Sequence, residues 1–355
     1  MANTILNIGN ARSAVIECFS AQPPLVPLLQ GPPGLGKSDM IKQIGKELNL
    51  KVIDLRLAQC EPNDLLGYPS IIEGRTTYVP MDIFPLASDP LPLDTNGDEM
   101  DGWILFLDEI RNASTHVQMA AYRLILDHEV GNNPMHERCL VVAAGNREQD
   151  GCFVPPMTAA LKSRMIHLEM GIDKQEWLGW AVNKGVDARI TSFISYKPDM
   201  LQTAYADSKE ASYGCGRTWE FVNRLIQGKT NDQLMGIVNR SLIEGAISSA
   251  VAIDFFSFIK YFDSVASYKD VIKDPKKAKC PSQDDIGLIW ATIGMLTGNF
   301  EVKDTAQVLE YMGRIPEEYQ MVFMKEISVR HPNIISKPEM KPWIDIIAEV
   351  LWGAA

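Results

Sequence analysis

The chain has 355 residues and a formal net charge of −11, with 45 acidic residues against 34 lysines and arginines. This acidic balance argues against broad, non-specific nucleic-acid binding, although it leaves room for a local basic patch. No apolar run reaches the length of a membrane span, and no basic segment followed by an apolar stretch opens the chain. The six cysteines lie far apart, which argues against a zinc site or disulfide framework, so we expect a cytoplasmic protein without a membrane partner.

The first pattern along the chain is a glycine-rich loop between a strand and a helix. After a short helix predicted over 10–20, an apolar run at 25–29 predicts a buried strand, and helical spacing predicts a helix over 38–48. The segment between this strand and the start of the helix consists of Gly31, Pro32, Pro33, Gly34, Leu35, Gly36, Lys37 and Ser38. This is a complete P-loop pattern. It predicts that backbone N–H groups and Lys37 bind the phosphates of a nucleotide and that Ser38 binds magnesium. The alternative is a glycine-rich turn that matches by chance.

Strands and helices continue to alternate up to residue 170. We predict strands at 52–55, 103–107, 139–144 and 165–168, and a helix at 114–126. We also predict a hairpin at 71–79, with its turn near Glu73-Gly74, and a second hairpin at 129–136. The stretch 89–101 is rich in aspartate, proline and glycine, which indicates a solvated loop. The alternation predicts an α/β fold with a doubly wound parallel sheet.

The pattern becomes entirely helical after residue 171. We predict helices over 174–183, 189–196, 218–227, 232–262, 284–296 and 305–312, a polar connector at 267–285, and a final helical part over 343–352. The predicted domains are therefore a nucleotide-binding α/β domain at 1–170, a helical domain at 171–265 and a helical C-terminal extension at 266–355.

Three polar residues follow two of the predicted strands. Asp108 and Glu109 come directly after the run at 103–107, and Asn146 follows the strand at 139–144. At the carboxyl end of its strand, Asp108 can hold the magnesium that Ser38 also contacts, and Glu109 can polarise an attacking water. Asn146 can contact that water or the γ-phosphate. The alternatives are an acidic helix cap for the pair and a plain β-turn asparagine for Asn146.

These segments resemble a known family. Gly31–Ser38, Trp103–Glu109 and Val141–Asn146 are similar to the Walker A, Walker B and sensor 1 elements of AAA+ ATPases. More specifically, the chain resembles the MoxR-like, dynein-related group, because the stretch at 56–69 is similar to that group's segment after the second strand. It departs mildly from the group at Glu61, where an aspartate is usual, and at Asn63, where a hydroxyl residue is usual.

The resemblance covers the chain to about residue 265. Arg217-Thr218-Trp219 resembles the group's sensor 2 element, with Gly216 in place of the usual proline, so we expect a looser entry to that helix. The remaining residues are similar to the helical tail of stand-alone, often phage- or plasmid-borne, members.

The resemblance implies an AAA+ core with a helical lid that uses ATP and Mg²⁺. It implies Lys37, Glu109, Asn146 and Arg164 as catalytic residues, with Arg164 as the arginine finger that reaches the γ-phosphate of a neighbouring subunit. Arg217 would contact the nucleotide in cis. A surface ion pair is the alternative for Arg164, and Arg147 is its rival in sequence. A finger acting in trans requires a homo-oligomer, most often a hexameric ring or spiral in this family.

The leading functional hypothesis is a chaperone-like ATPase that remodels a protein client. Relatives often work with a separately encoded protein carrying a von Willebrand-type domain. The alternatives are a nucleic-acid motor or loader and a nucleotide-gated scaffold, and GTP stays open because no base-reading motif is present. The two hairpins match family insertions that face substrate, which makes Tyr68, Tyr78, Met135 and His136 candidate contacts; ordinary surface hairpins are the alternative.

Overall fold

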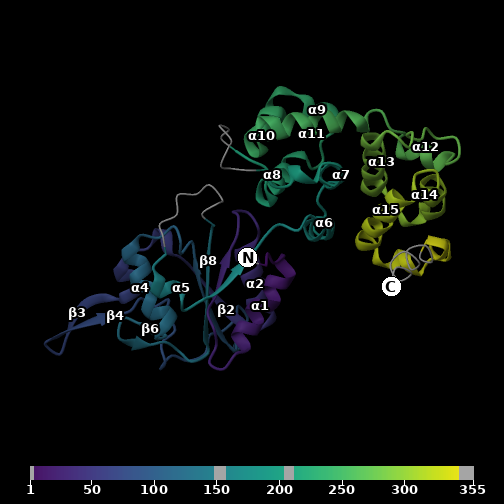
Figure 1. Ribbon diagram of the computed structural model, residues 1–355. Helices are drawn as coiled ribbons and strands as arrows, with labels where there is room; N and C mark the ends of the chain where they lie inside the picture. Colours follow the sequence, from purple (N-terminus) through teal and green to yellow (C-terminus); the bar gives the residue numbers. More distant parts are fainter. Residues whose placement is uncertain (1–3, 148–156, 204–211, 344–355) are drawn as a thin grey trace. The chain divides into compact units, whose positions relative to one another are not determined.

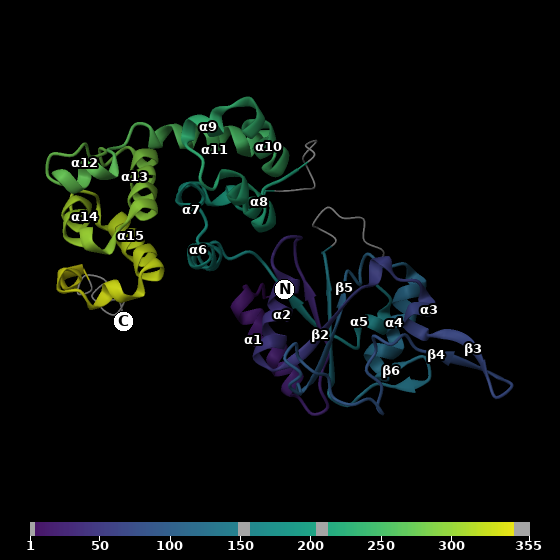
Figure 2. The same ribbon diagram turned by 180° about the vertical axis from the view of Figure 1, so that it is seen from behind.

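The computed structural model describes residues 4–147, 157–203 and 212–343. The chain forms two compact units, Met1–Asp173 and Lys174–Ala355 (Figures 1 and 2). The predicted division into three domains, at residues 170 and 265, stays a prediction. Among the described residues, no helix combines the length and the apolar character that crossing a membrane requires.

The first unit is built on a five-stranded sheet with strand order β2-β5-β8-β1-β9. The strands are β1 (Pro27–Gln30), β2 (Leu50–Arg56), β5 (Gly102–Asp108), β8 (Cys139–Gly145) and β9 (Ile166–Glu169). Every neighbouring pair in this sheet is parallel. The predicted doubly wound parallel sheet of a P-loop NTPase is therefore confirmed, and it places the carboxyl ends of all five strands along one edge.

Helices cover both faces of this sheet, as Figures 1 and 2 show. The helices are α1 (Ile8–Ser20), α2 (Lys37–Glu47), α3 (Pro62–Leu66), α4 (Thr115–Leu126) and α5 (Ala159–Lys162). In β5, Ile104 and Phe106 belong to the core shared with α1 and α2, whereas Leu105 and Leu107 belong to the core shared with α3, α4 and α5. Period-two alternation thus divides the apolar residues of one strand between two cores, which buries the strand on both faces.

Two hairpins form small two-stranded sheets of their own, separate from the five-stranded sheet. They are β3 (Tyr68–Ile72) with β4 (Arg75–Val79), and β6 (Glu129–Val130) with β7 (Asn133–Pro134). The predicted turn at Glu73-Gly74 is confirmed, because both residues have positive φ, 53° and 76°. Figure 1 shows the β3–β4 hairpin projecting from the rest of its unit. Tyr68 and Tyr78 are exposed there, at 49% and 44%.

The second hairpin does not expose the residues predicted for it. Met135 is only 3% exposed and lies in the core on the α4 side of the sheet, so its predicted contact with substrate is wrong. The ring of His136 lies 5.0 Å from that of Trp103 and is half-buried. Met135 follows a short hairpin whose β6 residue Val130 is also buried, which turns the segment inward.

The described part of the second unit is helical. Its α-helices are α6 (Lys174–Asn183), α7 (Ala188–Tyr196), α8 (Gly216–Ile226), α9 (Asn231–Met235), α10 (Ile237–Ile247), α11 (Ser249–Phe262), α12 (Tyr268–Lys273), α13 (Ile286–Asn299), α14 (Thr305–Met312) and α15 (Glu317–Arg330). Short 3₁₀ turns are η1 (Leu57–Gln59) in the first unit and η3 (Pro198–Met200), η4 (Val302–Asp304), η5 (Pro332–Ser336) and η6 (Pro338–Met340) in the second.

The single long helix predicted over 232–262 is wrong. The segment forms α9, α10 and α11, separated at Gly236 and Ser248. Gly236 has an extended ψ of 145°, and Ser248 has φ 78°, a left-handed conformation that no α-helix continues. The Ser248 N–H donates to the Ser212 hydroxyl instead of to a helical carbonyl. A contact distant in sequence therefore breaks an apolar segment whose local pattern reads as continuous.

Two further differences lie in the C-terminal part. The connector predicted at 267–285 contains α12, capped by the Ser267 hydroxyl, which accepts from the Asp270 N–H. α15 is not among the predicted helices; it buries Phe323, Met324 and Ile327. From residue 344 on, the helical part predicted over 343–352 lies outside the described residues.

α13 packs against both earlier and later helices of the second unit. It contacts α7, α11 and α15. The approach to α7 is so close that a Cβ added at Gly294 would lie 2.4 Å from the Ser192 hydroxyl. The Glu326 carboxylate of α15 accepts hydrogen bonds from Arg330 and from the Thr191 hydroxyl of α7, at 3.0 and 3.3 Å. The helices on either side of residue 265 thus share their packing.

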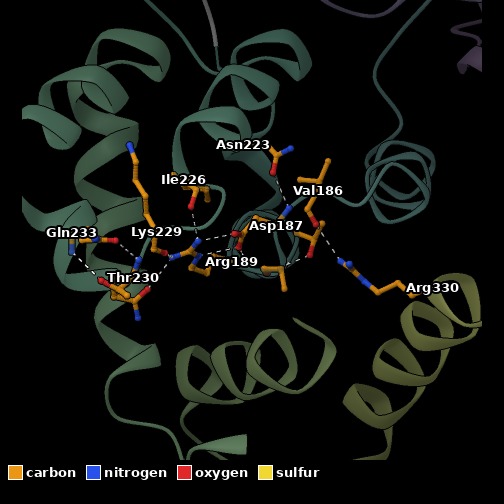
Figure 3. A network of polar contacts seen from close by, with 12 residues as sticks. Val186, Asp187, Arg189, Asn223, Ile226, Lys229, Thr230, Gln233 and Arg330 are labelled. Carbon is orange, nitrogen blue, oxygen red and sulfur yellow. Dashed lines mark hydrogen bonds and ion pairs between the residues drawn. The ribbon is translucent and has the colours of Figure 1, made fainter. Parts of the chain in front are cut away.

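A polar network also fixes the end of α8 (Figure 3). The Arg189 side chain makes two hydrogen bonds to Asp187 and donates to the carbonyl oxygens of Ile226 and Lys229, at and just beyond the last turn of α8. The Asn223 side chain accepts the Asp187 N–H at 2.9 Å. Because Arg189 is largely buried and its partners are charged or carbonyl oxygens, this network holds α8 firmly against α7.

Candidate nucleotide-binding site

The loop between β1 and α2 has the backbone that a phosphate cradle needs. Gly34 and Gly36 have positive φ values of 77° and 93°, a region that residues with a Cβ rarely adopt. α2 begins at Lys37 directly after Gly36, so its first N–H groups point toward the loop. Gly31 packs tightly, since a Cβ there would lie 2.9 Å from the Met170 carbonyl oxygen.

The Lys37 side chain lies inside this loop and is only 9% exposed. Its ammonium donates to the carbonyl oxygens of Gly31 and Pro32, at 2.6 and 3.1 Å. It also donates to the Asn146 side-chain oxygen at 3.4 Å, which joins the P-loop to the end of β8. A buried ammonium is stable only with such partners. Two of the residues singled out in the sequence, 109 positions apart, therefore meet at this edge of the sheet.

Ser38 and Asp108 form the second contact of the site. The Ser38 hydroxyl donates to Asp108 Oδ2 at 3.0 Å, and Asp108 Oδ1 accepts the backbone N–H of Glu109 at 2.8 Å. Asp108 is the last residue of β5, and Ser38 lies in the first turn of α2. A hydroxyl and a carboxylate at this distance are the oxygen donors that Mg²⁺ takes from proteins, so the residues fit that ion.

Glu109 leaves β5 in a left-handed backbone conformation, with φ 56°. Few non-glycine residues adopt it, and those that do concentrate at functional sites. The turn is held by the Asn112 N–H, which donates to the Glu109 carbonyl, and by the Ile110 N–H, which donates to Ala144 of β8 at 3.0 Å. The half-buried Glu109 therefore sits in a defined turn at the same edge as the P-loop.

Arg111 belongs to this edge and was not among the residues predicted from the sequence. It is only 7% exposed, and its side chain packs on Gly145 immediately before Asn146. A charged residue in the turn between the buried Ile110 and Ala113 is the sequence signal that would have indicated it. Arginine is rarely this buried without a structural or functional reason.

The two candidate finger arginines lie at opposite ends of the sheet. Arg147 follows the carboxyl end of β8, and its guanidinium lies 3.2 Å from the carboxylate of Glu169, the last residue of β9. Arg164 instead precedes β9, whose first residue Ile166 pairs with Pro27 at the start of β1. The P-loop follows the other end of β1. The fold therefore brings Arg147 to the P-loop edge of its own chain and keeps Arg164 at the opposite edge.

The Arg164 side chain lies on α4 and α5. Its guanidinium is 4.8 Å from the centre of the Tyr122 ring, and Nη1 donates to the Ala160 carbonyl at 2.8 Å. The residue is half-buried. A cation held over an aromatic ring keeps a preferred direction while part of its donor set stays available.

Arg217 lies in the second unit, exposed in the first turn of α8. The Thr218 hydroxyl accepts the Cys215 N–H at 2.8 Å and lies within donating distance of the Tyr213 and Cys215 carbonyl oxygens, which caps the helix at its start. The looser entry expected from Gly216 stays a prediction. Trp219 is fully buried, and its indole N–H donates to the Met200 carbonyl at 2.9 Å. The contact of Arg217 with nucleotide stays a prediction.

Comparisons with known proteins agree with the α/β architecture. Residues 27–165 match the family described as the AAA domain of the dynein-related subfamily. No curated protein matches the chain.

Solved structures that resemble the chain include RuvB, the Holliday junction branch migration motor of Thermotoga maritima, with 17% identity over 76% of this chain and 75% of that one and a TM-score of 0.40. A RuvB mutant from the same organism has 18% identity over 76% of each chain and a TM-score of 0.42. NtrX from Brucella abortus in complex with ATP has 13% identity over 93% of this chain and 69% of that one, with a TM-score of 0.41. The family match over residues 27–165 and the parallel five-stranded sheet agree with an AAA+ P-loop NTPase fold.

Proposed function

We propose that the chain is a MoxR-like AAA+ ATPase that hydrolyses ATP in a Mg²⁺-dependent reaction. The observation that carries the proposal is the meeting of Ser38 with Asp108 at 3.0 Å beside the buried ammonium of Lys37. A cation, a hydroxyl and a carboxylate at the carboxyl edge of a parallel sheet are what triphosphate and magnesium require together.

In this proposal each residue of the edge has one task. The backbone of Gly31, Pro32, Pro33, Gly34, Leu35 and Gly36 and the Lys37 ammonium would hold the phosphates, and Ser38 and Asp108 would hold Mg²⁺. The ion, when bound, neutralises charge on the phosphate oxygens. The Glu109 carboxylate would accept a proton from the attacking water, and Asn146, which already contacts Lys37, would orient that water.

The position of Arg164 supports action in trans. Since it lies at the sheet edge opposite its own P-loop, it would serve the site of an adjacent subunit, which requires a ring or spiral, most often a hexamer in MoxR-like proteins. An arginine fork there would stabilise charge on the transferred phosphoryl group. Arg217, exposed at the start of α8, would contact the nucleotide in cis.

We further propose that hydrolysis drives chaperone-like remodelling of a protein client in the cytoplasm, with a separately encoded von Willebrand-type domain protein as a candidate partner. The projecting β3–β4 hairpin supports a protein contact, because Ile71 is 81% and Ile72 50% exposed beside Tyr68. Exposed apolar side chains gathered on one element are typical of protein interaction sites.

Affinity capture with a Glu109→Gln variant in the presence of ATP tests this function. The variant should hold ATP and retain its client, whereas a Lys37→Ala variant prepared in parallel should retain neither. Recovery of a protein that depends on ATP and on an intact Lys37 supports remodelling. Recovery of nucleic acid instead, with ATPase activity stimulated by added DNA, would favour a nucleic-acid motor and reject the protein client.

A further inference from the structure

We propose that Arg111 is a positioning residue for ATP hydrolysis, and that the aliphatic part of its side chain sets the spacing between Glu109 and Asn146. The inference rests on the proposed ATPase function. Arg111 lies outside both the P-loop and the Asp108-Glu109 pair, and the proposed ATPase mechanism gives it no role. It is nevertheless buried at the same edge of the sheet, with only 7% of its surface exposed.

The turn after β5 and the end of β8 touch at two points. β5 and β8 are parallel neighbours, with Leu107 paired to Ala143, so their carboxyl ends lie side by side. The first contact is the backbone hydrogen bond from the Ile110 N–H to the Ala144 carbonyl at 3.0 Å. The second is the Arg111 side chain on Gly145.

The second contact leaves no free space. A Cβ added at Gly145 would lie 2.8 Å from Arg111 Cγ, 3.2 Å from its Cβ and 3.4 Å from its Cδ. The stem of Arg111 therefore occupies the volume that a side chain at position 145 would need. Because protein interiors are close-packed, this contact sets the distance between the turn after β5 and the end of β8.

The two contacts lie next to the proposed catalytic pair. Glu109 immediately precedes Ile110, and Asn146 immediately follows Gly145. Glu109 also has the left-handed φ of 56°, which depends on its surroundings to hold it. A change in the Arg111 stem would thus move the water-activating carboxylate relative to the water-orienting amide. A misplacement of about 1 Å can lower turnover by about 10²-fold.

Two variants of Arg111 in the full chain separate the stem from the charge. Arg111→Met keeps most of the stem and removes the charge, whereas Arg111→Ala removes both. We expect Arg111→Met to keep kcat within about threefold of wild type and Arg111→Ala to lose about tenfold or more, with the KM for ATP unchanged in both, when each variant is assayed well below its unfolding midpoint. An equal loss of kcat in the two variants, or no loss in Arg111→Ala, would overturn the inference.

Gly145→Ala tests the same contact without altering Arg111. Its added methyl group should lower kcat, and combining it with Arg111→Ala should recover part of the loss, because the shortened side chain vacates the space that the methyl group needs. Losses that simply add in the double variant would contradict the proposed contact. Wild type and Glu109→Gln are measured alongside: an inactive wild type rejects the ATPase function itself, whereas an active wild type with an inactive Glu109→Gln leaves the Arg111 variants to decide the inference.

Discussion

The Ser38 hydroxyl donates to the Asp108 carboxylate at 3.0 Å, a contact between residues 70 positions apart. Ser38 lies in the first turn of the helix after the P-loop, and Asp108 is the last residue of the interior strand β5. The hydrogen bond brings together the two oxygens that would bind Mg²⁺ in the proposed site. The proposed metal role of these two residues is directly testable.

Asp108→Asn should remove most of the effect of Mg²⁺ on ATP affinity. The amide loses the negative charge that a divalent cation needs, although it keeps an oxygen near Ser38. Calorimetric titration with and without Mg²⁺ should show the Mg²⁺-dependent gain in affinity reduced about tenfold or more. Asp101→Asn is the control, because this exposed residue lies just before the opposite end of the same strand. Undiminished Mg²⁺ dependence in Asp108→Asn would reject the metal role.

Lys37→Ala should abolish tight nucleotide binding, because it removes the cation that the loop carbonyls and Asn146 hold in place. Charge-assisted hydrogen bonds to phosphate support an affinity loss of about tenfold or more. Lys42→Ala is the matched control on the same helix, since Lys42 is exposed and lies 3.6 Å from the Asp54 carboxylate. Fluorescent-nucleotide titration measures both variants. Similar nucleotide affinities for Lys37→Ala and Lys42→Ala would contradict the proposed role of Lys37 in binding the phosphates.

Variants of Arg164 and Arg147 should differ in whether mixing them with Lys37→Ala subunits restores ATPase activity. Mixing Arg164→Ala with Lys37→Ala subunits should restore ATPase activity, because some sites then combine an intact P-loop with an intact neighbouring Arg164. Mixing Arg147→Ala with Lys37→Ala should restore none if Arg147 acts at the edge of its own chain. A homogeneous Arg164→Ala preparation should lose about 10³-fold in turnover. Failure of the first mixture, once mixed assembly is verified, would reject action in trans.

Glu326 should give the second unit a measurable pH dependence. Burial raises the pKa of its carboxyl, against the opposing effect of the neighbouring Arg330 guanidinium. A folded-state pKa above the usual 4.5 means that the folded carboxyl retains a proton which the unfolded one has released, so its contribution to stability grows as pH falls between the raised value and 4.5. Denaturant unfolding should therefore show the free energy of wild type rising relative to Glu326→Gln as pH is lowered through that range. A relative stability that falls instead would contradict the raised pKa.

Much of the first unit could be predicted from its sequence because its signals are local. The glycines of the P-loop, the apolar run of β5 and the Glu73-Gly74 turn each require a particular backbone, and the structure has each of them. The meeting of Lys37 with Asn146 follows once the strands are known to be parallel, since their carboxyl ends share one edge.

The features that escaped prediction depend on partners distant in sequence. Ser248 interrupts an apolar segment by donating its N–H to Ser212, and Arg111 packs on Gly145 of a different strand. Met135 follows a turn-rich hairpin, yet the core of the first unit buries it. Helical or polar sequence patterns alone do not predict such contacts, because they depend on tertiary packing.

Steady-state phosphate release by wild type and Glu109→Gln, measured together with their ATP affinities, tests the central claim most directly. The carboxamide cannot accept the proton of the attacking water but leaves Lys37, Ser38 and Asp108 in place. We predict an affinity like that of wild type and phosphate release slower by about 10²–10⁴-fold. Undiminished phosphate release by Glu109→Gln, or a wild type that neither binds nor cleaves ATP with Mg²⁺, would contradict the account.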